Sequence, residues 1–417
     1  MRYAIIGFSV AAVNAVKAIR EIDKNGEIVI VSDEKKVYSR PLISYLLAGK
    51  IKKENIGFID GDFDKKYKLN LYMSNTVDKI NFNSKTVFLN TREKLTYDRL
   101  LICTGGVPIK PSIEGYDGKT KGIFTFTNLS DAEELVKYIE KEKIKEAVIL
   151  GGGLIGMKAA EGLLGRNIKL TIIELTNRLL SNTFDEDASG ILEEKLKSLG
   201  SKFIKENTIK KIATKSEKIQ QVILSDGKIL KTGLLVLSVG VKPNLELVKG
   251  SGIKTNKGII VNEYMEASIK GVFVAGDVCE GKDFISGENS VIAIWPVAAK
   301  QGKIAGYNMA GKKEKYDGMF AMNSVEILGI PTISFGITNP AKNNAYEVLK
   351  KNETNRYKKI VLKDNKVVGV ILVNSIERAG IYGLLIKEKL DVSGFKNELL
   401  KDDFGFLLLP KDFRKHF

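Results

Sequence analysis

Two segments of the chain share one pattern of apolar and polar positions. Residues 2–22 begin with an apolar run, turn at a glycine and continue with apolar residues at helical spacing, and residues 27–34 form a second apolar run that ends in acid. Residues 146–166 and 168–174 repeat this order. Such a pattern predicts a β-strand, a glycine turn, a helix and a parallel second strand. The chain therefore predicts two dinucleotide-binding subdomains.

The remaining patterns predict further strands and helices around these two units. Residues 69–101 hold short β-rich pieces broken by Asn, Ser and Lys, which we interpret as added strands. The segment NLSDAEELVKYIEKEK predicts a helix with Asn128 or Ser130 as its cap and acids in its first turn. The apolar pattern resumes after residue 240, and the last hundred residues, from Gly318, predict a mixed strand and helix domain.

The composition favours a globular protein of several domains. The chain has 417 residues, of which 44% are apolar, and at ~150 residues per domain it holds roughly two to four domains. This composition excludes a disordered chain, a collagen and a disulfide-stabilised miniprotein. The net charge of +16 suits acidic partners or polyanions, although a general abundance of lysine explains the charge equally well.

The cysteines and the histidine carry no recognisable motif. Cys103 and Cys279 lie far apart, without a Cys-x-x-Cys or a His-containing partner motif, which argues against a zinc site and fits a reducing compartment. The single histidine, His416, stands at the C-terminal end, and we do not expect it to act as a base. The sequence therefore predicts no metal site.

The N-terminus allows two interpretations. Arg2 followed by an apolar run could form the charged and apolar regions of a signal peptide. A strand, a glycine turn and a helix explain the segment better, because Lys17 and Arg20 continue the helical pattern. No uninterrupted apolar run approaches the ~20 residues of a membrane helix. We therefore expect a cytoplasmic protein.

The second glycine turn is the stronger nucleotide motif. Gly151-x-Gly153-x-x-Gly156 follows directly after the apolar run EAVIL. The first glycine allows the tight turn, the second lets the backbone approach a pyrophosphate, and the third lets helix and strand pack closely. Glu174 ends the next strand, where a carboxylate can hold a ribose diol and repel the extra phosphate of NADP. The carboxylate favours NADH as the nucleotide, although Arg178 leaves NADPH open. The alternative is that this segment is an ordinary strand–helix turn that binds no nucleotide.

The first glycine turn departs from this motif. The three positions carry Gly7, Ser9 and Ala12. Alanine at the third position is tolerated because it only packs helix on strand, whereas serine at the second places a β-carbon where the phosphates come closest. Either the Ser9 hydroxyl donates to a phosphate, or the cofactor is slightly displaced. Glu34, with Asp33 beside it, is the candidate for the ribose.

Five further segments follow one another in an order that resembles a known family. Along the chain they are the loop YSRPLIS, Cys103-Thr104-Gly105, the turn VGVKPN, the strand end GVFVAGDV, and Trp295-Pro296 before AAKQG. In this order, up to about residue 310, the chain resembles the FAD-dependent pyridine nucleotide-disulfide oxidoreductase superfamily. The resemblance implies that Asp277 holds the FAD ribityl chain, and that the loop with Arg40 and Pro41 covers the pyrophosphate and the flavin. A helix N-terminus near the flavin would stabilise the charge of its reduced form.

The motifs and the resemblance together imply an α/β fold. It consists of two Rossmann-like dinucleotide-binding, three-layer domains and a C-terminal α+β interface domain. Residues 1–118 and 241–317 are expected to form the FAD-binding domain, residues 119–240 the NAD(H)-binding domain, and residues 318–417 the interface domain. FAD is expected to contact Gly7, Ser9, Ala12, Glu34, Arg40, Pro41, Val77, Thr104, Gly105, Gly276, Asp277, Trp295, Pro296 and Ala298. NAD is expected to contact Gly151, Gly153, Leu154, Ile155, Gly156, Glu174 and Gly240.

Missing cysteines set the chain apart within this superfamily. The resemblance is closest to NADH:rubredoxin reductases, the flavin part of nitrite reductases and electron-transfer subunits of ferredoxin-type 2-oxoacid dehydrogenases. Disulfide reductases carry two cysteines, and the peroxidase and oxidase branch one, shortly after the first acid, where this chain has RPLISYLLAGKI. Cys103 and Cys279 lie inside FAD-binding strand motifs and are expected to be packing residues. Electrons would leave the flavin without a protein dithiol.

Two positions expected to face the flavin also differ. Many relatives place a lysine after the RPPLS-like segment and a glutamate after the third glycine, as an ion pair near flavin N5. Here the matching residues are Tyr45 and Lys158, so a cation alone would lie near the flavin and shift its potential. The alternative is that Lys158 only extends along the helix surface.

The motifs leave two main hypotheses for the function. The first is an NAD(P)H oxidoreductase that passes electrons from NADH through FAD to a small acidic carrier, such as a rubredoxin or ferredoxin, or to a partner subunit. The second is a non-catalytic FAD- and NAD-binding protein whose nucleotide controls the binding of another macromolecule. Lysines are dispersed among glutamates, as in EKEKIKE, which argues against nucleic acid. The sequence leaves open whether the protein forms a homodimer.

Overall fold

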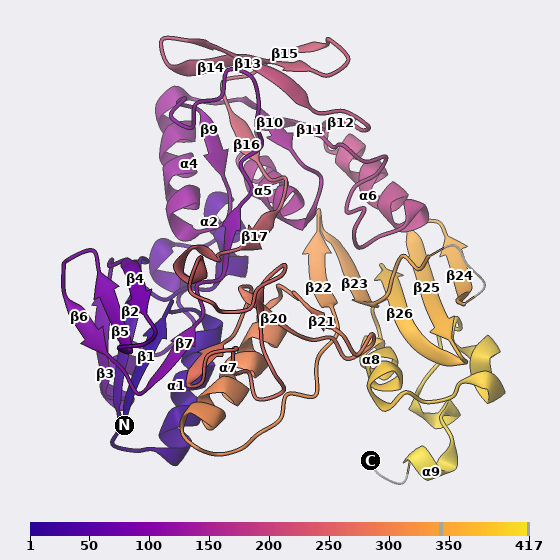
Figure 1. Ribbon diagram of the computed structural model, residues 1–417. Coiled ribbons are helices and arrows are strands. Elements are labelled where there is room, and N and C mark those ends of the chain that lie inside the picture. Colours follow the sequence, from indigo (N-terminus) through magenta and orange to yellow (C-terminus); the bar gives the residue numbers. More distant parts are fainter. Residues whose placement is uncertain (342–344, 415–417) are drawn as a thin grey trace. The chain divides into compact units, whose positions relative to one another are not determined.

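The computed structural model describes residues 1–341 and 345–414, and for residues 412 and 413 only the backbone (Figure 1). His416 lies outside the described residues. Two compact units form. Unit 1 comprises residues 1–42, 52–108 and 241–320, and unit 2 comprises residues 43–51, 109–240 and 321–417. Among the described residues, no helix has an apolar stretch long enough to cross a bilayer.

The core of unit 1 is a parallel sheet of five strands in the order β19-β7-β1-β2-β3. Its strands are β1 (Arg2–Ile6), β2 (Glu27–Ser32), β3 (Leu69–Met73), β7 (Arg99–Ile102) and β19 (Val272–Val274). The central strands are buried apolar runs, as expected for a parallel sheet covered on both faces. The carboxyl ends of all five strands therefore lie along one edge.

Two helices of unit 1 pack unusually closely. Helix α1 (Val10–Ile22) follows β1 through the first glycine turn, and helix α7 (Trp295–Met309) is the segment predicted from WPVAAKQGKIAGYNMAG. Gly302 and Gly306 of α7 face α1, and a β-carbon at Gly302 would lie 2.1 Å from the Ala11 carbonyl oxygen. Glycine is therefore required for this contact, which fixes the two helices above the sheet edge.

Smaller elements complete unit 1. The antiparallel sheet β4-β5-β6 comes from residues 69–101, so the prediction of added strands there is confirmed. The remaining elements are η1 (Arg40–Leu42), η2 (Lys53–Ile56), α3 (Phe63–Lys66), β4 (Val77–Asn81), β5 (Thr86–Leu89), β6 (Lys94–Thr96), β8 (Gly106–Pro108), β17 (Val241–Pro243), η3 (Glu246–Val248), β18 (Ile259–Ile260), β20 (Cys279–Lys282) and β21 (Asn289–Ser290).

Unit 2 contains a second parallel sheet, in the order β12-β11-β10-β16-β9. Its strands are β9 (Ile123–Thr125), β10 (Glu146–Leu150), β11 (Lys169–Ile173), β12 (Lys202–Ile204) and β16 (Leu235–Leu237). Helices α4 (Leu129–Glu142), α5 (Leu154–Leu164) and α6 (Glu186–Ser198) connect them, and an antiparallel sheet is formed by β13 (Ile209–Lys215), β14 (Lys218–Leu224) and β15 (Ile229–Lys231). Of the two predicted caps of α4, Asn128 is the one used, and its side chain accepts a hydrogen bond from the Asp131 amide at 2.8 Å.

The C-terminal part of unit 2 is an antiparallel sheet in the order β22-β23-β26-β25-β24. Its strands are β22 (Met322–Ile327), β23 (Ile330–Gly336), β24 (Glu347–Glu353), β25 (Arg356–Lys363) and β26 (Lys366–Val373). The other elements of unit 2 are α2 (Ile43–Leu47), α8 (Ala379–Glu388), η4 (Ser393–Glu398), η5 (Phe406–Leu408) and α9 (Lys411–Arg414). The predicted α/β fold, with two nucleotide-binding sheets and a C-terminal α+β domain, is confirmed.

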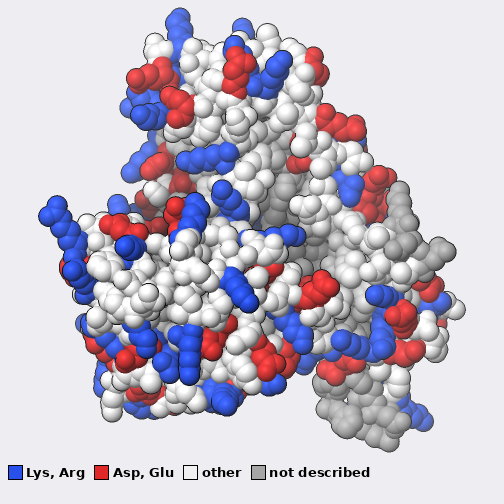
Figure 2. All heavy atoms as spheres, viewed as in Figure 1, with Lys and Arg blue, Asp and Glu red and all other residues white. Residues whose placement is uncertain are grey.

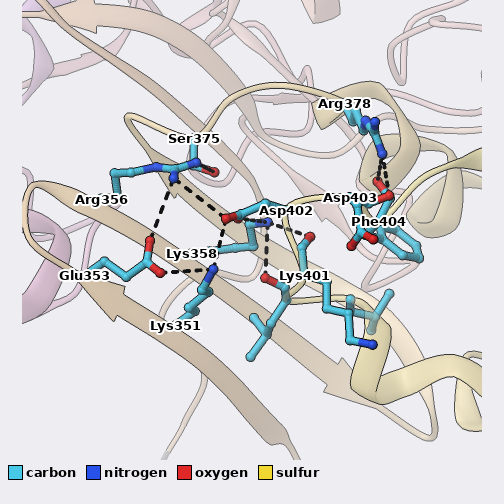
Figure 3. Close-up of polar contacts among 12 residues, drawn as sticks. Lys351, Glu353, Arg356, Lys358, Ser375, Arg378, Lys401, Asp402, Asp403 and Phe404 are labelled. Carbon is cyan, nitrogen blue, oxygen red and sulfur yellow. Dashed lines mark hydrogen bonds and ion pairs between the residues drawn. The ribbon is translucent and has the colours of Figure 1, made fainter.

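Side chains, rather than a strand ladder, hold the end of this domain (Figure 3). The buried Lys358 ammonium donates to the carbonyl oxygens of Leu400, at 3.3 Å, and Lys401, at 3.2 Å. The Asp402 carboxylate lies 3.0 Å from Lys351 Nζ and 3.5 Å from Lys358 Nζ. The Lys401 carbonyl oxygen also accepts the Phe404 amide at 3.3 Å. Leu400 lies outside the helices and strands, so Lys358 supplies its carbonyl oxygen with a side-chain donor.

Candidate nucleotide-binding sites

In unit 1 the residues predicted for FAD gather at the carboxyl edge of the parallel sheet. Gly7 follows β1, Glu34 lies two residues beyond β2, Thr104 lies two residues beyond β7, and Gly276 and Asp277 follow β19. Ligands of open α/β sheets bind outside this edge, where the strand order reverses. In the sheet order β3-β2-β1-β7-β19, the reversal lies between β1 and β7, beside Gly7 and Thr104.

The first glycine turn requires glycine at one position and tolerates a side chain at the next two. Gly7 has φ +98°, and a β-carbon there would lie 2.3 Å from the Cys103 carbonyl oxygen. Ser9 is the N-cap residue of α1, but its side chain makes no capping hydrogen bond to the described helix. Ala12 is completely buried. The Ser9 hydroxyl is therefore not used by the helix that it begins.

Glu34 and Arg40 are brought together in the loop after β2. The Glu34 carboxylate accepts a hydrogen bond from the Tyr38 hydroxyl at 2.7 Å and lies 3.5 Å from the Arg40 guanidinium. Arg40 in turn lies over the Tyr38 ring, 5.9 Å from its centroid. Pro41 is the second residue of η1, which begins at Arg40. The acid predicted for the ribose is thus part of a polar cluster at the start of the loop that the resemblance expects to cover the pyrophosphate.

The turn after β19 presents a carboxylate with little support from the protein. Burial raises the pKa of Asp277, and the positive charge of Arg40 opposes this rise. No described residue donates a hydrogen bond to this carboxylate. A partly buried acceptor without a protein donor has free hydrogen-bonding capacity, which a ligand hydroxyl would use. This observation fits the hydroxyl-rich ribityl chain of FAD.

A residue that the sequence analysis missed holds this turn in place. Gln301 of α7 is 2% exposed, and its side-chain oxygen accepts the Gly276 amide at 2.9 Å. Gly276, at φ +82°, also accepts the Cys279 amide at 2.8 Å. Both backbone groups of Gly276 are therefore fixed. The signal in the sequence was a polar residue on the apolar face of a helix.

The other positions predicted for FAD lie on several elements of unit 1. The Thr104 hydroxyl donates to the Asn244 carbonyl at 3.2 Å, and the Asn244 amide donates to the Gly105 carbonyl at 2.9 Å, which closes the junction of β8 and β17. Trp295 begins α7 and contacts Phe58 edge to face, with centroids 4.8 Å apart. The other three positions are Val77, which is the first residue of β4, Pro296, which is the exposed second residue of α7, and Ala298, which is buried in the first turn of α7.

The second glycine turn, in unit 2, keeps open the space that the motif requires. Gly151 has φ +108°, and a β-carbon there would lie 2.4 Å from the Ser238 carbonyl oxygen. Gly153 is the N-cap residue of α5, and no described atom outside its chain neighbours and the helix backbone lies within 4 Å of its missing β-carbon. A β-carbon at Gly156 would lie 2.0 Å from the Gly151 carbonyl oxygen. The middle glycine thus leaves room where a pyrophosphate would approach the helix N-terminus.

The acid after β11 is tied directly to this turn. Glu174 Oε2 accepts the Gly152 amide at 2.6 Å, and Oε1 accepts the amide and the hydroxyl of Thr176 at 2.8 and 2.9 Å. The carboxylate is therefore held beside the nucleotide turn. Leu154 and Ile155 are the first two residues of α5, and Gly240, with φ +119°, lies beyond the end of β16.

Arg178, which left NADPH open, is occupied by its own loop. Its guanidinium donates to the carbonyl oxygen of Phe184 at 3.0 Å, to that of Ser181 at 3.3 Å and to the Asn177 side-chain oxygen at 3.0 Å. Moving it toward a 2′-phosphate would break all three bonds.

Lys158 and Tyr45 lie together, but Lys158 is not a cation alone. Its ammonium lies 5.5 Å from the Tyr45 ring centroid and forms an ion pair with Glu161, one helical turn further along α5. It also donates to the Glu326 carbonyl oxygen at 3.3 Å, while Glu161 Oε1 accepts the Leu328 amide at 2.7 Å. The expectation of a lysine without an acidic partner is corrected, because an acid three residues away on the same helix compensates the charge. These side chains border a cavity of about 210 Å³.

Both cysteines are reduced and buried. Burial raises the pKa of the Cys103 thiol to about 12, and it raises that of the Cys279 thiol, with the Glu280 carboxylate adding to the effect. Because the thiolate is the reactive form, neither residue is suited to redox chemistry at neutral pH.

Comparisons with known proteins agree with this geometry. Residues 1–302 match the pyridine nucleotide-disulphide oxidoreductase family, and residues 322–390 match the rubredoxin NAD+ reductase C-terminal domain. An NADH oxidase of Methanocaldococcus jannaschii is 34% identical over 324 residues, which is 76% of this chain and 71% of that protein. The epsilon subunit of the NADH-dependent phenylglyoxylate dehydrogenase of Aromatoleum evansii is 30% identical over 403 residues, 96% of this chain and 94% of the subunit. The crystal structure of NADH:rubredoxin oxidoreductase from Clostridium acetobutylicum is 25% identical, with a TM-score of 0.77 over 95% of this chain and 97% of that one.

Proposed function

The chain belongs to the pyridine nucleotide-disulphide oxidoreductase family, and from this premise we propose that it passes electrons from NADH through FAD to a small acidic carrier protein. It is an NAD(P)H-dependent flavin oxidoreductase that uses FAD and NAD(H), so the predicted cofactors are confirmed. FAD, when bound, takes a hydride from the nicotinamide and releases its electrons to an acceptor. The proposal assigns FAD to residues 1–118 and 241–317, NAD(H) to residues 119–240 and the acceptor's contacts in part to residues 318–417.

The proposed FAD site combines one acceptor with one cation. The unsupported Asp277 carboxylate would accept ribityl hydroxyls, and Arg40, at the start of the covering loop, would lie near the pyrophosphate. Thr104 and Gly105 would border the flavin, because they follow the strand next to the first glycine turn. Each role uses a group that the fold already places at the carboxyl edge of the sheet.

The proposed preference for NADH rests on two residues of unit 2. The Glu174 carboxylate is held beside the turn because the Gly152 amide and the Thr176 amide donate hydrogen bonds to it. A 2′-phosphate placed there would meet a carboxylate rather than a cation. Arg178 does not compensate, since its donors are taken up by the loop at residues 177–184.

The state of the two cysteines carries the proposal about the acceptor. Both thiols are buried, with pKa values well above neutrality, and the sequence has no further cysteine. Electrons therefore cannot pass through a protein dithiol, and an external acceptor must take them from the flavin. Reduced cysteines also fit a cytoplasmic location, which is part of the proposal.

The charge of the chain supports an acidic carrier. The net charge is +16, and Figure 2 shows Lys and Arg interspersed with Asp and Glu on this face rather than gathered into one basic block. Such a surface favours electrostatic steering of an acidic protein over tight binding of a polyanion. Rubredoxin is the partner named for the matching reductase of Clostridium acetobutylicum.

Two measurements test this function. Rapid mixing of NADH with the holoprotein should bleach the visible flavin absorbance, and the reduced protein should then reduce an acidic rubredoxin or ferredoxin. We expect the second rate to fall about tenfold from low to physiological ionic strength. Bleaching without reduction of any acidic carrier, or a rate that is independent of salt, would contradict the acceptor. Absence of bleaching would contradict the proposed oxidation of NADH.

A further inference from the structure

Ser238, directly after β16, bridges two carbonyl groups of the neighbouring strand. It is 7% exposed, and its hydroxyl lies 2.9 Å from the Leu150 carbonyl oxygen and 3.1 Å from that of Gly151. Its own amide also donates to the Leu150 carbonyl at 2.8 Å. One side chain is thus shared by the last residue of β10 and the first glycine of the turn.

Cys103 occupies the corresponding place in unit 1. It directly follows β7, the neighbour of β1, and its sulfur lies 3.1 Å from the Ile6 carbonyl oxygen and 3.4 Å from that of Gly7. Its amide donates to the Ile6 carbonyl at 2.9 Å. The same three contacts therefore recur in two sheets whose sequences differ at this position.

The bridge determines where the next peptide points. In a trans peptide the carbonyl of one residue and the amide of the next point in opposite directions. When Ser238 holds the Gly151 carbonyl, the Gly152 amide is directed the other way, and this amide is the one that donates to Glu174 Oε2 at 2.6 Å. Ser238 therefore acts on the ribose-binding acid through a single peptide.

We propose that Ser238 and Cys103 are equivalent positioning residues, each of which fixes the first peptide of a nucleotide-binding turn by bridging the carbonyls that flank its first glycine. Ser238 supports the binding of NAD and Cys103 that of FAD. The inference depends on the FAD and NAD sites of the proposed function, but not on the acceptor.

The two bridges differ in strength. A hydroxyl is a good hydrogen-bond donor, whereas a thiol is a weak one. The high pKa of Cys103 keeps its proton in place, so the thiol remains a donor at neutral pH. Loss of the side-chain donor should therefore affect the NAD turn more than the FAD turn.

Reciprocal variants of the holoprotein test the proposal. We expect Ser238→Ala to raise the dissociation constant of NAD+ for the oxidised protein about fivefold to tenfold and to leave FAD release on dilution unchanged. Cys103→Ala should speed FAD release about twofold to threefold and leave NAD+ binding unchanged. Cys103→Ser should slow FAD release, because a stronger donor replaces a weaker one, and Ser238→Cys should lie between Ser238→Ala and the unchanged protein.

A control separates positioning from general loss of stability. Thr232→Val removes another buried hydroxyl of unit 2, which donates to the Leu234 carbonyl at 2.7 Å, and should leave NAD+ binding unchanged. The proposal is overturned if Ser238→Ala and Thr232→Val weaken NAD+ binding equally, or if Ser238→Ala folds and binds NAD+ normally. If Ser238→Ala fails to fold, Ser238→Cys supplies the same test. None of these measurements uses a carrier protein, so their outcome does not depend on whether the proposed electron acceptor is correct.

Discussion

The two glycine turns have similar backbone conformations at their first glycine and differ at their middle position. Gly7 and Gly151 both have positive φ values, and a β-carbon added at either would lie only 2.3 or 2.4 Å from a carbonyl oxygen of the neighbouring strand's end. The middle position is open at Gly153 and carries a side chain at Ser9. The fold itself thus requires glycine at the first position. The fold leaves the middle position unconstrained, so only this position can differ between the two units.

The acids of the two halves differ in the same sense. Glu174 is bonded to the amide of the turn, at Gly152. Glu34 is instead bonded to Tyr38 and paired with Arg40, further along its own loop. Unit 2 therefore holds its acid through the backbone, and unit 1 holds its acid through side chains of the loop after β2.

Replacing the first glycine should have the largest effect. Gly151→Ala places a methyl group 2.4 Å from the Ser238 carbonyl in a strained backbone conformation, so we expect a loss of about 3 kcal/mol or more in stability and of NAD+ binding beyond measurement. Thermal unfolding and calorimetric titration measure the two effects. Gly153→Ala, in open space, should keep the stability and lose only binding, and equal melting temperatures for the two variants would contradict this division.

Removal of the charge of Glu174 should change the nucleotide preference. Glu174→Gln keeps an acceptor for the Gly152 amide but removes the repulsion of a 2′-phosphate, so kcat/KM for NADPH should rise about tenfold while that for NADH falls by a smaller factor. Steady-state rates of flavin-dependent oxidation give both values. An unchanged ratio would show that Glu174 does not select the cofactor.

Substitution at the middle position of the first turn should have a smaller effect. The Ser9 hydroxyl is not used by helix α1, so it is available to a phosphate oxygen. We expect Ser9→Ala to raise the dissociation constant of FAD about threefold to tenfold. Ser9→Gly should weaken binding less, because it also removes the obstructing β-carbon. Tighter binding by Ser9→Ala would instead favour a displaced cofactor.

The smallest expected effect is on how the stability of the apoprotein depends on pH. Burial raises the pKa of Asp277, so the folded apoprotein binds more protons than the unfolded chain between the two pKa values. Its stability should therefore fall as pH rises from about 4 through the folded-state pKa. Asp277→Asn should remove this slope and weaken FAD binding. Denaturant unfolding of the apoprotein across this range checks the sign, and an unchanged slope would contradict it.

The sequence was sufficient to predict features that depend on residues close to one another in the chain. The strands, the turns at Gly7 and Gly151, and the acid at Glu174 follow from apolar runs and glycine spacing. Long-range side-chain contacts were not predictable. Gln301 meets Gly276, 25 residues earlier in the chain, because helix α7 packs beside the end of β19.

The environment of Lys158 shows why the rest of the site escaped prediction. Its helix partner, Glu161, lies three residues away and was available to sequence reasoning. Its other partner, the Glu326 carbonyl, comes from a hairpin 168 residues further along the chain. No local pattern encodes such a contact, since it depends on how the C-terminal sheet packs within unit 2.

The ion pairs that attach residues 399–404 make the local stability of the C-terminal end sensitive to salt. The ion pairs of Asp402 with the partly exposed Lys351 and Arg356 are weakened by added electrolyte, whereas the buried Lys358 keeps its bonds to backbone oxygens and the apolar sheets remain intact. Trimming by a protease at this end should therefore accelerate in concentrated salt, ahead of any change in the flavin spectrum.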